Sequence, residues 1–181
     1  PVDEILTHGG KTLGVRLEGG DEIFSPLVIS SAGVINTYGK FLRNAPNIKS
    51  YSQQLKTVTP TPSYVCLYMG LNKSSEELKI DNTNLWIYPS YDHDKNVSTF
   101  LNDVEQDFPV VYVSFPSAKD PEYLEKHPGS STMEAITVSP WWYYDTWSNK
   151  PWKNRGDDYE MIKSKISERI LKKVYEYVPQ A

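Results

Sequence analysis

Cysteine is almost absent from this chain, which has only one such residue, Cys66, among its 181 residues. A single cysteine excludes a disulfide within the chain and argues against a cysteine-based metal site. Cys66 lies in a run of aromatic and β-branched residues, so we expect it at a buried position on a strand. The sequence therefore predicts a fold held together by packing alone.

Long apolar runs are also missing. No stretch approaches the roughly 20 residues that a transmembrane helix needs, and Pro1 does not open a signal peptide. The one clear amphipathic helix has the pattern of a helix that faces a core, so it does not predict a membrane anchor. We therefore expect either a cytoplasmic location or a peripheral contact with a membrane.

The usual signatures of catalysis are absent as well. The sequence has no glycine-rich phosphate loop, no His-Glu-x-x-His and no Gly-x-Ser-x-Gly. Its three histidines, His8, His93 and His127, are scattered among turn residues and are expected in solvated loops. Paired acids do not follow the spacing of a calcium loop, so no metal site is predicted. The net charge of −4 argues against a general nucleic-acid binder.

What the sequence does contain is a set of short β-strands. Residues 2–7 and 12–17 alternate in polarity between glycine turns and predict a hairpin, and residues 27–30 predict a further strand that stops at Gly33. Aromatic and β-branched residues predict four more strands, separated by turn-rich charged stretches such as residues 91–96. These strands are expected over residues 63–71, 84–90, 109–115 and 133–139.

A helix is predicted over residues 158–178, because Ile162, Ile166, Ile170 and Val174 recur every four residues. Asp157 and Glu160 have the spacing of a capping box at its start. The helix should cover one face of the sheet formed by the four strands. The sequence thus predicts an α+β fold with an antiparallel or mixed sheet packed by helices.

An aromatic run over residues 140–147 admits three interpretations. The rings could cap the core at the end of the sheet. They could line a long apolar pocket or tunnel, since aromatic side chains offer a large contact area at low entropic cost. They could also form a subunit or domain interface.

Several segments carry a resemblance to a known family. Residues 2–5, 14–20 and 28–33 are similar to the middle of FAD-dependent oxidoreductases of the phytoene desaturase and amine oxidase superfamily. Residues 112–121, 68–71 and 141–143 resemble the branch that holds the carotenoid cis-trans isomerases and retinol saturases. The resemblance extends over nearly the whole chain.

The resemblance implies that this chain is a fragment of a larger flavoprotein, as its abrupt start also suggests. Residues 1–35 would be a remnant of the FAD-binding domain, with Val2 and Gly33 near the cofactor. Residues 36–181 would be the substrate-binding domain. The glycine-rich loop that grips the FAD pyrophosphate in this family does not occur here, so the fragment alone is not expected to retain FAD.

The substrate implied by the resemblance is an apolar polyene, a carotenoid or a retinoid. The parent enzyme would isomerise, saturate or desaturate its C=C bonds through the flavin, so no catalytic side chain can be transferred. Partners would be the polyene and the rest of the same polypeptide. The expected substrate-binding residues are Tyr68, Trp86, Tyr88, Trp141, Trp142 and Tyr143.

Two other functions stay open. The chain could be a non-enzymatic module that binds apolar ligands or other proteins through its aromatic run. It could instead belong to the amine oxidase branch, with a polar amine as substrate. The aromatic cluster has no matching carboxylate cage, which argues against the amine, although Asp145 keeps it open.

Overall fold

The computed structural model describes residues 1–46, 48–58 and 61–181. It forms two compact units, residues 1–61 and 62–181. The structural division lies after the boundary expected at residue 35, because the short helices that follow residue 33 pack within the first unit. Which functional domain residues 36–61 belong to stays a prediction.

The first unit is built on a three-stranded antiparallel sheet with the order β1-β2-β3, formed by β1 (Val2–His8), β2 (Lys11–Leu17) and β3 (Glu22–Phe24). The predicted hairpin is therefore confirmed. The strand predicted over residues 27–30 is wrong, because these residues have no strand assignment and pair with no described strand. Leu27 and Ile29 are exposed as a result.

A buried carboxylate ties this sheet to the segment that follows it. The segment begins with α1 (Val34–Asn36), the π-helix η1 (Thr37–Phe41) and, further on, α2 (Ile48–Leu55). Glu4 is buried on β1, where it accepts hydrogen bonds from Arg16 Nη1 at 2.6 Å and Asn44 Nδ2 at 2.7 Å. These two partners satisfy the charge that burial would otherwise make costly.

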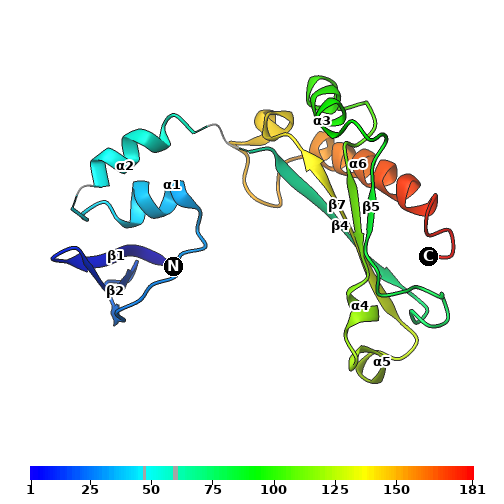
Figure 1. Ribbon diagram of the computed structural model, residues 1–181, viewed down its shortest axis with the longest axis horizontal. Helices are drawn as coiled ribbons and strands as arrows, with labels where there is room; N and C mark the ends of the chain where they lie inside the picture. The colour runs from blue at the N-terminus through cyan, green and yellow to red at the C-terminus, as the bar shows by residue number, and fades with distance from the viewer. Residues whose placement is uncertain (47, 59–60) are drawn as a thin grey trace. The chain divides into compact units, whose positions relative to one another are not determined.

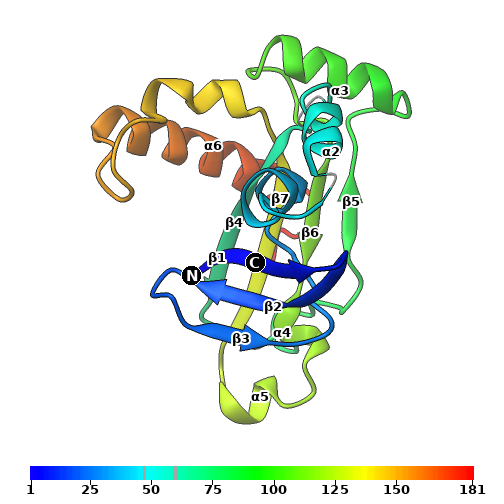
Figure 2. The same ribbon diagram turned by 90° about the vertical axis from the view of Figure 1, so that its left-hand side faces the viewer.

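The second unit contains a four-stranded antiparallel sheet with the order β4-β7-β6-β5 (Figure 2). Its strands are β4 (Ser63–Leu71), β5 (Leu85–Ile87), β6 (Val111–Ser114) and β7 (Ser131–Ser139). All four predicted strands are confirmed, with shorter bounds for β5 and β6. β4 and β5 are the edge strands.

One face of this sheet is covered by the long helix α6 (Asp157–Tyr175), as Figure 1 shows. Ile166, Ile170 and Val174 of the helix share a core cluster with Val113 and Ala135 of the sheet. The prediction that this helix lies on one face of the sheet is confirmed, although it begins one residue earlier and ends three residues earlier than expected.

The capping box expected at the start of α6 does not form. Gly156 is the N-cap, with a φ of 93° that favours glycine, and no side chain caps the helix. Tyr159 N–H and Glu160 N–H donate to the Gly156 carbonyl instead. Asp157, Asp158 and Glu160 still lie in the first turn, where negative charge favours the helix dipole.

The charged stretch at residues 91–96 is not a loop throughout, which corrects that expectation. It holds the start of α3 (His93–Asn102), whose N-cap Asp92 accepts a 3.0 Å hydrogen bond from Lys95 N–H. The helix carries Phe100 into the core, against Phe108. The remaining helices are α4 (Pro116–Lys119), α5 (Tyr123–Lys126) and the 3₁₀-helix η2 (Trp141–Trp147).

Cys66 differs from expectation in its burial, whereas the three histidines are solvent-exposed as predicted. Cys66 is on a strand, as predicted, but it is only half-buried. His93 is exposed on α3, while His8 ends β1 and His127 follows α5, both exposed.

The packing of α6 on the sheet makes a testable prediction. Ile170→Ala should lower the free energy of unfolding by about 2–5 kcal/mol, because it empties a side-chain volume in a close-packed core. Met161→Ala is the matched control on the same helix, since Ile170 is 1% exposed and Met161 is 64% exposed. Urea denaturation followed by circular dichroism measures both. Equal losses in the two variants would contradict the assignment of the buried face.

Candidate functional site

The face of the four-stranded sheet opposite α6 carries a row of apolar side chains. Trp86, Tyr112, Ile136 and Cys66 are direct cross-strand neighbours from β5 to β4. Side chains alternate along each strand, so all four point to the face that α6 does not cover. The Trp86 and Tyr112 ring centroids lie 4.6 Å apart. With neighbouring strands about 4.8 Å apart, the row is about 14 Å long.

This row, which we call the aromatic row (Trp86, Tyr112, Ile136 and Cys66), is open to solvent. Trp86 is 61% exposed and the other three side chains are half-buried. Exposed apolar residues on a protein surface normally lie singly, so four contiguous apolar side chains call for an explanation. It offers a flat apolar surface.

The neighbouring row on the same face is polar. Tyr68 lies opposite Glu134, and Glu134 lies opposite Ser114. Lys119 Nζ donates to Ser114 Oγ at 2.9 Å. A side-chain hydrogen bond with Cys66 raises the pKa of Tyr68, which keeps its phenol neutral at physiological pH. The apolar surface therefore ends at groups that can hydrogen-bond to a hydroxyl.

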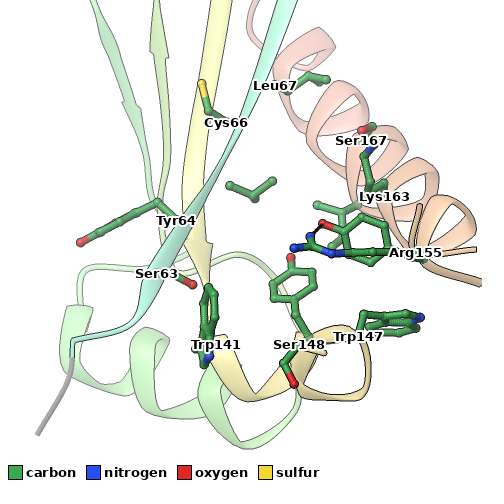
Figure 3. A pocket seen from close by; sticks show the side chains of 14 residues that line it. Ser63, Tyr64, Cys66, Leu67, Trp141, Trp147, Ser148, Arg155, Lys163 and Ser167 are labelled. Carbon is green, nitrogen blue, oxygen red and sulfur yellow. Dashed lines mark hydrogen bonds between the residues drawn. The ribbon is translucent and has the colours of Figure 1, made fainter. Parts of the chain in front are cut away.

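A second feature, a cavity of about 460 Å³, lies beside the edge strand β4 (Figure 3). Its walls come from β4, the 3₁₀-helix η2, the turn after it and the first half of α6. Figure 3 shows Leu67 on the side of the strand that faces α6, whereas Tyr64 and Cys66 extend from the other side. Tyr64 and Cys66 also line the cavity, so the cavity and the aromatic row share part of β4, although the side chain of Cys66 extends away from Leu67.

The aromatic wall of the cavity follows from the geometry of η2. A 3₁₀-helix has 3.0 residues per turn, so residues three apart stand on one side of it. Trp141, Tyr144 and Trp147 have this spacing, and all three line the cavity. Tyr159 of α6 meets this wall edge-on, with its ring centroid 6.4 Å from that of Tyr144 and 5.6 Å from that of Trp147.

Polar groups of the cavity are few. Tyr144 OH and Ser139 Oγ lie 2.5 Å apart, and burial raises the pKa of Tyr144, so the phenol stays neutral. Arg155 Nη1 donates to Tyr159 OH at 2.8 Å, and the guanidinium carbon lies 4.9 Å from the centroid of the same ring. Lys163 also lines the cavity and pairs with Glu160 at 2.9 Å.

The structure does not bring the six predicted substrate residues together. Tyr68 and Trp86 lie on the open face of the sheet, and Trp141 lines the cavity. Tyr88 stacks edge-on against His93, with 4.4 Å between ring centroids. The other two lie on other sides of η2: Trp142 is exposed, and Tyr143 packs against the core.

Several residues of both features were missed in the sequence. Tyr112 and Ile136 join the aromatic row because of strand register, which single-strand patterns do not give. The spacing of three between Trp141, Tyr144 and Trp147 was visible and would have grouped them, had a 3₁₀-helix been expected. Arg155 lies in a polar turn without periodicity, so no pattern marked it.

The expectation that Val2 and Gly33 lie near FAD stays a prediction; both residues belong to the first unit. Val2 pairs with Leu17 within the sheet of the first unit. Gly33, with a φ of 83°, directly precedes the continuous helical segment formed by α1 and η1. Neither residue lines one of the described cavities.

No helix in the described part of the chain has both the length and the apolar composition to cross a bilayer.

Comparison with known proteins identifies relatives over almost the whole chain. All-trans-retinol 13,14-reductase of Rattus norvegicus is 31% identical over 187 residues, which cover 97% of this chain. A Danio rerio protein named inactive all-trans-retinol 13,14-reductase is 32% identical over 184 residues, or 94% of this chain. Chloroplastic prolycopene isomerase of Arabidopsis thaliana is 25% identical over 174 residues, or 96% of this chain. No protein-family model matches the chain.

These relatives are much longer than the chain. The aligned segment spans 30% of the rat and zebrafish proteins and 27% of the Arabidopsis protein. The resemblance predicted from the sequence is confirmed for this segment. It does not by itself carry over the activity of the whole relatives.

Proposed function

We propose, from its homology to a segment of retinol saturases and carotenoid isomerases, that this chain supplies the substrate surface of a larger flavoenzyme. The enzyme would act on C=C bonds of a retinoid or carotenoid. The observation that carries the proposal is the aromatic row, an apolar strip on a sheet face that no described helix of the second unit covers.

The shape of the row suits a polyene. A conjugated chain is extended and flat, so it gains most from a strip of side chains that lie in one plane of a sheet. Aromatic rings contribute a large apolar contact area there at low entropic cost. The polar row beside it, with Tyr68 and Glu134, would receive a terminal hydroxyl.

FAD would supply the redox chemistry in the longer protein and would be held outside this chain. The residues of this chain would contribute in three ways: they would align the polyene, exclude water from it and hold its polar end. This division of labour explains why the sequence has no recognisable catalytic side chain.

A second function is favoured by one of the relatives. The zebrafish protein named inactive is as similar to this chain as the rat reductase is. Similarity over this segment is therefore compatible with binding without turnover. The alternative is a protein that binds an apolar ligand and does not convert it.

Substitution in the aromatic row tests the proposed surface. Trp86→Ser should weaken binding of all-trans-retinol by about tenfold, because it removes the largest apolar contact of the row. Tyr91→Ser is the matched control, since Tyr91 is fully exposed in a turn and outside the row. Retinol fluorescence measures both affinities. Equal affinity of wild type and Trp86→Ser would overturn the proposed surface.

The flavin assignment has its own test. The 181-residue chain should show no flavin absorbance after purification with added FAD, whereas a longer protein containing this segment should retain it. The longer protein is then assayed for conversion of all-trans-retinol and of prolycopene. Bound FAD without conversion of either polyene would favour the binding protein. Tight FAD binding by the short chain would contradict the proposal.

A further inference from the structure

The cavity beside β4 has a function of its own. We infer that it binds an elongated apolar molecule that ends in a carboxylate, with the carboxylate on Arg155. This inference does not rest on the proposed polyene surface, because Arg155 and the aromatic wall of the cavity lie on the side of β4 that faces α6, and of the aromatic row only Cys66 also lines the cavity.

The walls of the cavity select an apolar body. Val65 and Leu67 of β4 face Ile166 of α6, and Trp141 and Trp147 supply one aromatic side. A volume of about 460 Å³ is in the range of pockets that enclose small organic ligands. Apolar walls of this extent contribute affinity in proportion to the area of ligand they remove from water.

The Arg155 side chain selects the polar end. Its Nε is buried and has no hydrogen-bond partner among the described residues. That atom is covered by protein and does not itself open to the cavity, but the Arg155 side chain lines the cavity and brings its guanidinium charge there. Arg155 forms no ion pair within the described residues, and its Nη1 is bound only to the Tyr159 hydroxyl. Its positive charge is therefore available to an anion.

The count of charges favours a single negative charge. Lys163, the other cation of the lining, already pairs with Glu160, and no carboxylate side chain lines the described cavity. The single unpaired guanidinium therefore favours a ligand that carries one negative charge. The planar fork of arginine fits the two oxygens of a carboxylate, so we infer a carboxylate.

The test uses the whole 181-residue chain and cis-parinaric acid, a fluorescent long-chain carboxylate. Its methyl ester, which has the same body without the charge, should bind about tenfold or more weakly. Arg155→Gln should weaken binding of the acid by a similar factor and leave binding of the ester unchanged. Arg155→Lys should restore affinity only in part, because lysine keeps the charge and loses the fork.

Two pairs of matched variants keep the test informative. Lys126→Gln removes an exposed cation far from the cavity in sequence, on α5, and should not alter affinity for the acid. Trp141→Ala should weaken binding of acid and ester alike, whereas Trp152→Ala should affect neither. Trp141 lines the cavity and Trp152 does not, and both rings are largely exposed, so neither substitution should prevent folding. Circular dichroism confirms folding of each variant.

The outcomes separate this inference from the proposed function. A loss of parinarate affinity in Arg155→Gln, with retinol affinity unchanged, supports the cavity site. Equal affinity of acid and ester, or no effect of Arg155→Gln in a folded variant, overturns it. Loss of parinarate binding in Trp86→Ser but not in Trp141→Ala would also overturn it, because the acid would then lie on the aromatic row.

Discussion

The β4-β7-β6-β5 sheet has one buried face and one open face. This difference depends on the alternation of side chains along each strand and on the register in which the strands pair. Each strand sends every second side chain to the same face, so the register decides which residues of different strands meet. Val113 and Ala135 meet on the face that α6 buries. One residue before Val113 and one after Ala135, Tyr112 and Ile136 meet on the other face. A shift of one residue would exchange the core and the open surface, so burial of the aliphatic face also fixes the aromatic row.

A different periodicity builds the cavity. The step of three residues in η2 stacks Trp141, Tyr144 and Trp147 on one side, opposite the first turns of α6. The turn between η2 and α6 then brings Arg155 against Tyr159. The aromatic run at residues 140–147 thus separates into three roles: a cavity wall, a ring packed on the core at Tyr143 and an exposed ring at Trp142.

Much of this fold could be predicted from the sequence, because it rests on short-range patterns. The strands of the second unit and the apolar stripe of α6 follow from periods of two and four residues. The prediction of a strand at residues 27–30 was wrong, because an apolar run forms a strand only where a neighbouring strand can pair with it. The described residues provide no such partner there. The helix at His93–Asn102 was missed although Asp92 is a good N-cap residue. The candidate site was harder to predict from the sequence. The aromatic row depends on the register between strands that are far apart in sequence, and the role of Arg155 depends on a cavity that exists only in the folded chain.

The central claim is that a polyene lies on the aromatic row, and Cys66 allows the most direct test of it. Cys66 is the only cysteine of the chain and ends the row. It also lines the cavity, although Figure 3 shows its side chain extending from the side of β4 away from Leu67. The measurement is the rate at which iodoacetamide alkylates Cys66, with and without saturating all-trans-retinol, followed by mass spectrometry. The account predicts that bound retinol slows the alkylation of Cys66. An alkylation rate unchanged by bound retinol would contradict it.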